Sequence, residues 1–502
     1  MLYESTRNSN VSILSSEVIM QGIAPDGGLF LPKELPMVSL ETVKKMVDMD
    51  YCKRAESILN LFLTDFSIEE VQICVRNAYS NKKFDTDDIA PIYKLNNRQY
   101  ILELWHGPTC AFKDMALQIL PQLMIFAREK VEQKGQILIL VATSGDTGKA
   151  ALEGFKDVPG IRLVVFYPDE GVSDAQRMQM ITQDGANLDV ISVEGNFDDV
   201  QTGVKNLFAD EAFLQQVKNL GYRLSSANSI NWGRLVPQLV YYFSSYCDMI
   251  RAGAIATGEK INFVIPTGNF GNILAGYYAH KMGLPINRLI CASNTNNVLT
   301  DFFDTGVYNK NKEFIKTISP SMDILISSNL ERFLYEMTEH NSQKVSQWME
   351  SLKQDGIYEI DSETHSIMTD IIWAGYANDE QTCETIDSVF RDYHYLLDPH
   401  TAVGEKVYLD YIAQTQDKSK TVIIATASPF KFASDVLFSL EVPEISLSGD
   451  IFDLQMQLEK ISGGHTPESL RALKGKQVVH SKKYSKHAMM DAVTAIIKKA
   501  DS

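Results

Sequence analysis

The sequence predicts an α/β protein built on parallel β-sheet, with helices covering both faces of the sheet. Short apolar runs rich in β-branched residues recur from about residue 96 onward, and amphipathic stretches of helical periodicity separate them. The runs do not alternate apolar with polar residues, which is typical of parallel strands buried on both faces. The length of 502 residues also allows two to four domains of about 150 residues each.

Six apolar runs predict the strands in chain order. They are Ile137–Ala142, Arg162–Tyr167, Leu188–Val193, Ile261–Ile265, Arg288–Ala292 and Thr421–Ala425. Four amphipathic stretches between them predict helices over Lys149–Phe155, Asp174–Ile181, Asp198–Phe208 and Ile273–Met282. The segment before residue 96 is mixed: a turn at Pro25–Gly28 precedes helical patterning from Leu40 to Tyr79, and Pro91 closes it. The stretch 305–420 is mainly helical, and 480–502 reads as a short helix whose several lysines form a solvated face.

The charge balance excludes whole classes of partner. Lys and Arg number 47 against 64 Asp and Glu, a net charge of −17, so general affinity for nucleic acid or anionic membranes is not expected. No secretory signal and no run of about 18 apolar residues is present. The six cysteines are scattered, which predicts free thiols in a reducing compartment and hence a cytoplasmic protein.

The turn after the strand Ile261–Ile265 has the composition of an anion-binding loop. It reads Pro-Thr-Gly-Asn-Phe-Gly-Asn over 266–272 and leads into a helix. Gly268 and Gly271 are expected to let the backbone adopt positive φ and to converge successive N–H groups, to which the helix start adds its own. Two glycines alone also fit a plain tight turn, so Asn269 and Asn272 are what favour a phosphate site.

The turn after Ile137–Ala142 is rich in hydroxyl groups. It reads Thr-Ser-Gly-Asp-Thr-Gly-Lys over 143–149, but Thr143 and Ala150 stand where a nucleotide P-loop requires Gly and Ser or Thr. The hydroxyls of Ser144 and Thr147, with N–H groups at the helix start, suit a carboxylate. A helix N-cap by Thr143 or Ser144 explains the pattern equally well.

Lys113 stands where a helix begins, within His-Gly-Pro-Thr-Cys-Ala-Phe-Lys-Asp at 106–114. The positive end of a helix and partial desolvation favour the neutral amine, which a Schiff-base lysine requires. A surface lysine whose stem packs on apolar neighbours is the commoner case. No metal-ligand spacing and no Gly-x-Ser-x-Gly elbow occurs, so neither a metal site nor a serine hydrolase is predicted.

Together these motifs resemble threonine synthases, a family of fold type II pyridoxal-phosphate enzymes. Tyr-Glu-Ser-Thr-Arg at 3–7 and the stretch 22–32 are similar to that family's N-terminal domain. Ala-Thr-Ala-Ser-Pro-Phe-Lys-Phe at 425–432 resembles the segment that meets the pyridine nitrogen. Cys110 and Ser428 depart from the pattern, which usually has an aliphatic residue and a histidine there.

The resemblance implies two parallel-sheet domains with flanking helices in the fold type II architecture, plus a mixed N-terminal segment. It implies an N-terminal domain over 1–95 and a catalytic core over 96–435, with a small subdomain at about 136–230 inserted in the large one. A C-terminal segment over 436–502 is then expected to pack on the large domain. Lys113 would carry pyridoxal 5′-phosphate, Thr426 would meet its pyridine nitrogen, and its phosphate would be bound by Gly268, Asn269, Phe270, Gly271 and Asn272.

The implied reaction converts O-phospho-L-homoserine and water to L-threonine and phosphate, the last step of threonine biosynthesis, in a monomer or homodimer. Lys113 would move protons in it. The substrate carboxylate would be bound by Thr143, Ser144, Asp146 and Thr147, with the role of Asp146 open because a carboxylate repels the cofactor's phenolate. Four cations could meet the leaving phosphate, and the sequence does not rank them: Lys431, Arg7, Arg234 and Lys149.

Two alternatives use the same residues. A phospholyase would eliminate phosphate from a phosphorylated amino acid and yield a keto acid, and these motifs do not distinguish it. A catalytically inactive, ligand-binding relative is disfavoured because Lys113 and the 266–272 loop are intact.

Overall fold

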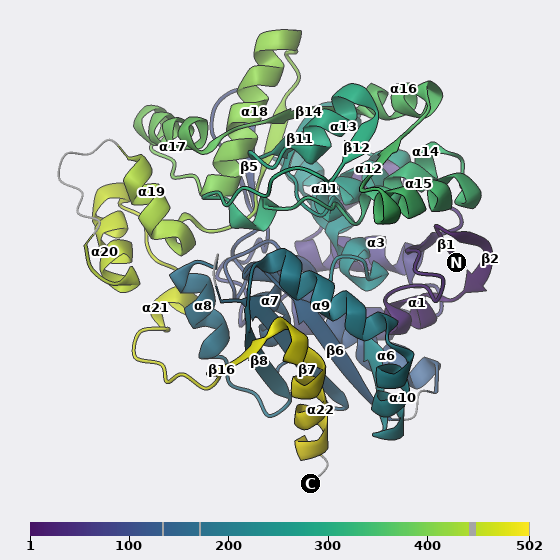
Figure 1. Ribbon diagram of the computed structural model, residues 1–502. Coiled ribbons are helices and arrows are strands. Elements are labelled where there is room, and N and C mark those ends of the chain that lie inside the picture. The colour runs from purple at the N-terminus through teal and green to yellow at the C-terminus, as the bar shows by residue number, and fades with distance from the viewer. Residues whose placement is uncertain (133–134, 170–171, 441–447, 501–502) are drawn as a thin grey trace.

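The computed structural model describes residues 1–132, 135–169, 172–440 and 448–500. It contains two parallel sheets, one in the upper and one in the lower half of Figure 1, and a small antiparallel sheet near the N-terminus. The α/β class predicted from the sequence is therefore confirmed. Parts of the expected catalytic core (133–134, 170–171) and of the expected C-terminal segment (441–447, 501–502) lie outside the described residues.

The larger sheet has the strand order β14–β11–β10–β15–β5–β4, in which every strand except the edge strand β4 is parallel to its neighbours. Its strands are β4 (Ile92–Lys94), β5 (Gln99–Glu103), β10 (Ile261–Pro266), β11 (Ile286–Ser293), β14 (Ile372–Tyr376) and β15 (Thr421–Ala425). Helix α18 (Pro399–Thr415) packs on one face, and α12 (Gly271–Lys281) and α13 (Val298–Thr305) on the other.

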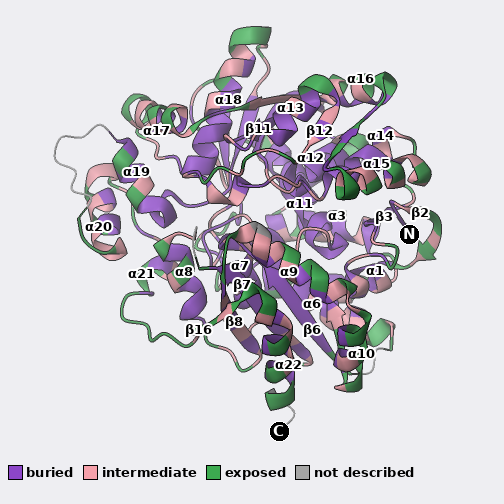
Figure 2. Cartoon of the chain, in the orientation of Figure 1, coloured by how far each residue is buried: buried purple, intermediate pink, exposed green. Residues whose placement is uncertain are grey.

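The smaller sheet has five parallel strands in the order β16–β8–β7–β6–β9. They are β6 (Gln136–Ala142), β7 (Ile161–Pro168), β8 (Leu188–Glu194), β9 (Tyr222–Ser225) and β16 (Lys482–Ser485). Successive residues of β6 enter different cores: Ile139 packs with α7 (Asp146–Phe155), and Leu140 with α9 (Phe197–Ala209). Burial on both faces, visible in purple in Figure 2, explains the uninterrupted apolar runs of the sequence.

The C-terminal segment does not pack on the larger domain as one unit, contrary to the expectation for 436–502. Strand β16 extends the smaller sheet by pairing with β8, and α22 (Met489–Ala500) packs against α9 (Figure 1, yellow beside blue). The expected helix with a solvated lysine face corresponds to α22, where Lys498 and Lys499 are exposed, while its opposite face buries Val493 and Ile497 in the core of the smaller sheet. Only α20 (Ile451–Ser462) and α21 (Glu468–Arg471) join α19 (Ala433–Ser439) beside β5 and β15.

The N-terminal part combines a three-stranded antiparallel sheet with helices. Its strands are β1 (Tyr3–Ser5), β2 (Asn8–Ile13) and β3 (Phe30–Pro32), and its helices are α1 (Ser15–Gln21), α2 (Leu40–Met46), α3 (Tyr51–Phe62) and α4 (Ile68–Ala78). The helical patterning from Leu40 to Tyr79 therefore corresponds to three helices. The long helix α11 (Trp232–Arg251) packs on α1, α2 and α3 and joins this part to the catalytic core.

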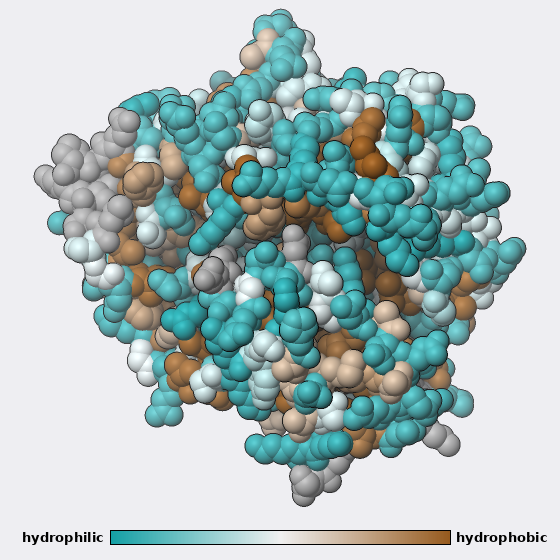
Figure 3. Space-filling model, viewed as in Figure 1, coloured by the Kyte–Doolittle hydropathy of each residue, from teal (hydrophilic) through white to brown (hydrophobic). Residues whose placement is uncertain are grey.

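The remaining elements lie around the two sheets. They are α5 (Asp114–Leu117), α6 (Leu120–Lys130), α8 (Asp174–Ile181), α10 (Glu211–Asn219), β12 (Val307–Asn309), α14 (Leu330–Met337), α15 (Ser342–Gln354), β13 (Ile357–Glu359), α16 (Ser362–Ile371) and α17 (Asp379–Tyr393). No helix in the described ranges has both the length and the apolar character of a membrane span. Hydrophilic side chains cover most of the face drawn in Figure 3, and hydrophobic ones show around the hollow between the upper and lower halves.

Candidate active site

Strands of both sheets end at one cavity of about 100 Å³. Ala142 at the end of β6 and Pro266 at the end of β10 line it, and Thr426 reaches it directly after β15. The carboxyl ends of parallel strands are where α/β proteins bind ligands. The cavity collects ten of the residues predicted from the sequence: Lys113, Thr143, Ser144, Thr147, Gly268, Asn269, Phe270, Gly271, Asn272 and Thr426. Asp146 is not among its lining residues, but its Oδ2 lies 3.3 Å from Lys113 Nζ.

Lys113 is fixed in the cavity wall by a bridge between two distant segments. Ala111 pairs with Ala427, and the Phe112 N–H donates to the Thr426 carbonyl at 2.8 Å. Lys113 is the residue that precedes α5, and its side chain is 11% exposed. Burial lowers the pKa of the Lys113 amine below its ordinary value, the Asp146 carboxylate opposes this, and the Lys431 ammonium supports it. The bridge therefore sets a nearly desolvated amine beside Thr426.

The 266–272 loop is bent at Phe270 and not at its glycines. Phe270 has φ of 60° and ψ of 2°, whereas neither Gly268 nor Gly271 has positive φ, so the expected backbone role of these glycines was wrong. Gly268 is needed for close approach, because a Cβ there would lie 3.0 Å from the Ser321 carbonyl oxygen. A side chain at this position would therefore press on the 320–322 turn and require it to move by a few tenths of an ångström.

The same loop presents unused hydrogen-bond donors to the cavity. The Tyr241 and Tyr242 hydroxyls donate to Asn272 Oδ1 at 2.7 and 2.8 Å, which fixes the amide, and Asn272 Nδ2 is buried without a partner. Helix α12 starts at Gly271, and the first N–H groups of a helix have no intrahelical acceptor. These donors at a helix start fit the phosphate of pyridoxal 5′-phosphate.

The hydroxyl groups of the 143–149 turn lie in different environments. Thr143 Oγ accepts hydrogen bonds from the N–H groups of Gly145 (2.9 Å) and Gly148 (2.8 Å), so its oxygen holds the turn before α7. Ser144 and Thr147 line the cavity. Gly145 is the N-cap residue of α7, so neither Thr143 nor Ser144 occupies the predicted N-cap position, although Thr143 stabilises the helix start through these hydrogen bonds.

The structure ranks the four candidate cations for a second phosphate. Arg7 pairs with Glu331 through two hydrogen bonds of 2.9 Å, Lys149 pairs with Glu153 at 2.8 Å, and Lys431 pairs with Asp146 at 2.5 Å. Arg234 alone of the four lines the cavity, and it has no ion pair within the described ranges. It is 3% exposed, and its Nε has no hydrogen-bond partner. Burial lowers the pKa of its guanidinium to about 10, so it remains a cation at neutral pH.

Several lining residues carried no signal in the sequence. His400 receives the Ser321 N–H on Nε2 at 3.1 Å and contacts Asp398 through Nδ1 at 2.8 Å, which fixes Nε2 as the acceptor. The pair thereby holds the 320–322 turn that closes over Gly268. Asn228 and Ser229 also line the cavity, and their place after β9 would have been a signal had that strand been predicted.

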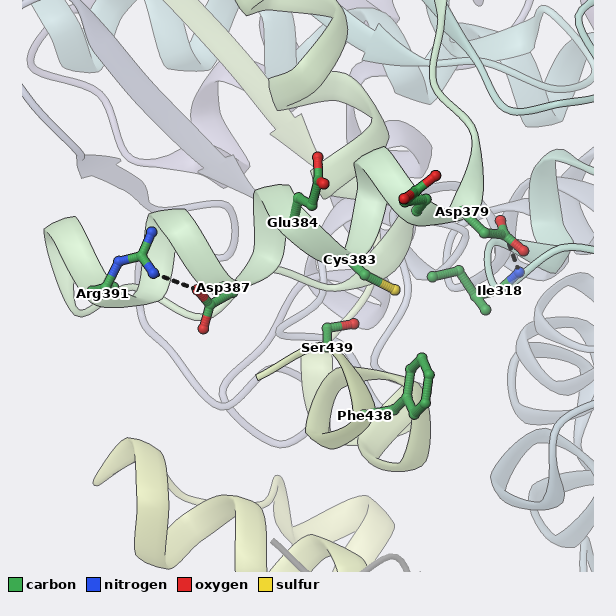
Figure 4. A pocket seen from close by; sticks show the side chains of 9 residues that line it. Ile318, Asp379, Cys383, Glu384, Asp387, Arg391, Phe438 and Ser439 are labelled. Atoms are coloured by element: carbon green, nitrogen blue, oxygen red, sulfur yellow. Dashed lines mark hydrogen bonds and ion pairs between the residues drawn. The ribbon is translucent and has the colours of Figure 1, made fainter. Parts of the chain in front are cut away.

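A second hollow, of about 570 Å³, lies between α17 and α19 and is lined by residues of different chemistry. Asp379 accepts the Ile318 N–H at 3.5 Å, and Arg391 pairs with Asp387 at 2.9 Å (Figure 4). Glu380 and Glu384 add further carboxylates. This larger hollow contains none of the predicted site residues, so the smaller cavity at the strand ends is the candidate active site.

Comparison with known proteins places the chain among characterised enzymes. A family model described as "Pyridoxal-phosphate dependent enzyme" matches residues 90–427, and one described as "Threonine synthase N terminus" matches 2–79. Threonine synthase from Pseudomonas aeruginosa is 38% identical over 436 residues, which covers 87% of this chain and 90% of that protein. Threonine synthase-like 1 from Homo sapiens is 40% identical over 442 residues and 86% of this chain, but the chain spans only 58% of that relative's length.

A solved structure agrees with the sequence matches. PLP-bound threonine synthase from Brucella melitensis superposes with a TM-score of 0.85 at 34% identity, covering 100% of this chain and 99% of that one. The fold and the cavity therefore define a fold type II pyridoxal-phosphate enzyme, and the cofactor is pyridoxal 5′-phosphate. Within that class, the chain belongs to the threonine synthase family.

Proposed function

We propose that the chain converts O-phospho-L-homoserine and water to L-threonine and phosphate. The observation that carries the proposal is Arg234: a buried cation without an acidic partner lines the same cavity as Lys113 and the 266–272 loop. The loop suits one phosphate, that of the cofactor, and Arg234 suits a second one. A substrate that is both an amino acid and a phosphate ester would react beside Lys113 through its amino-acid part and bind Arg234 through its phosphate.

The proposed roles follow from the chemistry of each side chain. Lys113 binds the cofactor covalently, then takes the substrate α-proton on Nζ and returns protons at the neighbouring carbons. The bound cofactor supplies an electron sink for the charge left on the substrate carbon. Thr426 supports the pyridine nitrogen with a neutral hydroxyl, which does not enforce protonation of the ring as a carboxylate would.

Two ends of the substrate are held while the chemistry proceeds. Ser144, Thr147 and N–H groups at the start of α7 bind the carboxylate, and Arg234 binds the γ-phosphate. Fixing both ends orients the α-C–H bond for Lys113 and leaves the β carbon open to one water.

We also propose the division into an N-terminal domain (1–95) and a catalytic core, with the last strand and helix of the chain assigned to the smaller sheet. The pairing of β16 with β8 supports this assignment. A cytoplasmic location is proposed from the scattered cysteines, and a monomer or homodimer from the resemblance to threonine synthases.

Product analysis tests the reaction. Purified protein loaded with the cofactor is incubated with O-phospho-L-homoserine in ¹⁸O-water, and phosphate, threonine and 2-oxobutyrate are quantified. We expect phosphate and threonine in equal amounts, with ¹⁸O in the new hydroxyl. A product mixture dominated by 2-oxobutyrate would assign the chain to the phospholyases instead, because elimination without hydration releases the keto acid.

A further inference from the structure

A buried ion pair lies directly behind Lys113, outside the cavity lining. Lys431 Nζ is 2.5 Å from Asp146 Oδ1, and the two side chains are 0% and 2% exposed. On the other side of the carboxylate, Lys113 Nζ is 3.3 Å from Asp146 Oδ2. Two amines therefore share one carboxylate, each on its own oxygen.

The surrounding hydrogen bonds fix this arrangement. Asp146 Oδ1 also accepts from Gln176 Nε2 at 2.8 Å, and Oδ2 from Ser321 Oγ at 3.0 Å. Lys431 Nζ donates to the Thr109 carbonyl at 3.0 Å. A buried ion pair with its remaining hydrogen bonds satisfied keeps one geometry, because any rotation leaves a buried polar group unpaired. Lys431 is therefore held away from the cavity, and Asp146 is held by Oδ1.

On the basis of the proposed function, we propose that Lys431 is a positioning residue for Lys113. It engages the Asp146 carboxylate by one oxygen, prevents that carboxylate from pairing fully with Lys113, and so keeps Lys113 available as the neutral base. In this arrangement Asp146 orients the Lys113 amine through a hydrogen bond without locking it as an ammonium ion.

The charged groups around Lys113, Asp146 and Lys431 support the positioning role of Lys431. Lys113 Nζ faces Asp146 on one side, with Arg234 and Lys431 further off, and it lies 4.7 Å from the centre of the Phe112 ring. His400, whose Nε2 accepts the Ser321 N–H, lines the same cavity. Lys431 also lies near Asp114 and Cys110; burial raises the pKa of Asp114 to about 6, and the thiol is buried. Asp146 is thus the one carboxylate in direct contact with Lys113 among the described residues.

The electrostatic balance gives the direction of the effect. Burial alone would raise the pKa of Asp146, but the ammonium groups of Lys431 and Lys113 hold it well below its usual range. Burial lowers the pKa of Lys113, Asp146 raises it, and Lys431 lowers it again. Without Lys431, the Asp146 carboxylate would pair with Lys113 alone, and the Lys113 amine would stay protonated to higher pH.

The test measures the Lys113 amine directly in the full chain freed of its cofactor. Competitive acetylation at a series of pH values, read on the peptide that contains Lys113, gives the pKa of that amine without using the reaction. We expect the wild type to titrate below an ordinary lysine. Lys431→Met should move the midpoint upward by at least one pH unit, a tenfold loss of neutral amine at a given pH. Lys431→Arg should restore the wild-type midpoint.

Two further variants keep the test decisive if Lys431→Met does not fold. Asp146→Asn removes the carboxylate and should lower the Lys113 midpoint, because only cations then face the amine. Lys149→Met is the control, since it breaks a pair on α7 between a buried lysine and the partly exposed Glu153, and neither residue lines the cavity. It should leave the Lys113 midpoint unchanged.

Each result bears on the proposal separately from the reaction. A folded Lys431→Met chain that titrates like the wild type would overturn it, as would a rise in the Lys113 pKa in Asp146→Asn. Either outcome would leave the threonine assignment untouched, because that assignment is tested by products. Conversely, formation of 2-oxobutyrate in place of threonine would not alter the Lys113 titration.

Discussion

Lys113 is the residue-scale centre of the site, since it lines the same cavity as Thr426 and Gly268–Asn272 and follows Phe112, whose N–H donates to the Thr426 carbonyl. Borohydride reduction of the loaded protein should therefore fix a pyridoxyl group on the peptide that contains Lys113. Peptide mapping by mass spectrometry measures the label. Lys113→Arg should carry none, and a label that persisted on another lysine in this variant would refute the assignment.

Arg234 is the residue we expect to hold the substrate phosphate. Its charge-assisted hydrogen bonds to a phosphate are worth about 1.5–3 kcal/mol, so Arg234→Met should raise KM by about 10- to 100-fold. Arg234→Lys should recover part of the loss. Steady-state kinetics gives KM, and equilibrium binding gives the cofactor affinity. An unchanged KM together with a weakened cofactor affinity would assign Arg234 to the cofactor phosphate instead.

The two glycines of the phosphate loop differ in what surrounds them. A Cβ at Gly268 would lie 3.0 Å from the Ser321 carbonyl oxygen, whereas one at Gly271 would have its nearest contact at 3.5 Å, on Asn329 Nδ2. Gly268→Ala should therefore shift the loop at a cost of about 1–3 kcal/mol. We expect a weaker cofactor affinity for Gly268→Ala than for Gly271→Ala, as measured by cofactor titration of the stripped protein. The reverse order would contradict the close-approach argument.

At the scale of elements, helix α18 carries a buried carboxyl group under the larger sheet. Glu405 is 3% exposed, and Gln99 Nε2 on β5 donates to both of its oxygens at 2.8 and 2.9 Å. Burial raises the pKa of Glu405 from 4.5 to about 7, against the effect of Gln99. Between these values the folded state binds more protons than the unfolded state, so stability falls as the pH rises from 4.5 to 7.

Glu405→Gln removes the free-energy cost of ionising a buried carboxyl group. The free energy of unfolding should rise by about 1–3 kcal/mol at pH 8 and change little at pH 4.5, where the wild-type carboxyl is already half protonated when unfolded. Urea denaturation at a series of pH values measures it. Glu363→Gln on the exposed surface of α16 is the control and should reproduce the wild-type profile. Equal stability of Glu405→Gln and wild type at pH 8 would show that Glu405 is not the source of the penalty.

The six predicted strands correspond to β6, β7, β8, β10, β11 and β15. Most contain an apolar run, although β8 is interrupted by Asp189 and Ser192. The sequence missed β16 and β5 for different reasons. Strand β16 reads Lys-Lys-Tyr-Ser, and as an edge strand it needs no apolar run. Strand β5 begins with Gln99, which is buried because it meets Glu405, a contact that no local pattern reveals.

The same limit applies to the site. The loops at strand ends were predictable because each one follows an apolar run, and the structure brings them to one cavity. The left-handed backbone at Phe270 was not, since two neighbouring glycines are the usual carriers of positive φ. Nor was the pairing of Lys431 with Asp146, because it depends on how the two sheets face one another.

At the scale of the whole molecule, the end of the chain completes the smaller sheet, and this gives a prediction with a matched pair of variants. Val493 on α22 is buried in the core of that sheet, whereas Ala495 on the same helix is exposed. Val493→Asp should lower the stability of this sheet by about 2–4 kcal/mol, because it buries an unpaired charge. Ala495→Asp should have little effect.

Hydrogen exchange locates the effect. Amide protons of β8 should exchange faster in Val493→Asp, while those of β10 and β15 keep their protection, because the larger sheet does not contact α22 through any extensive interface. Uniformly faster exchange in both sheets would indicate a single cooperative unit instead.

The bridge between Ala111 and Ala427 also bears on how the protein is made. The hydrogen bond from Lys431 to Thr109 spans 322 residues, and β5 lies in register with β15 along its whole length. The wall that holds Lys113 is therefore unfinished until more than four-fifths of the polypeptide, up to Lys431 of 502 residues, has been synthesised. Contacts this far apart in the chain form late and slowly. A nascent chain shorter than this contains Lys113 but lacks Thr426, so we expect vitamin B6 to be bound only near the end of synthesis.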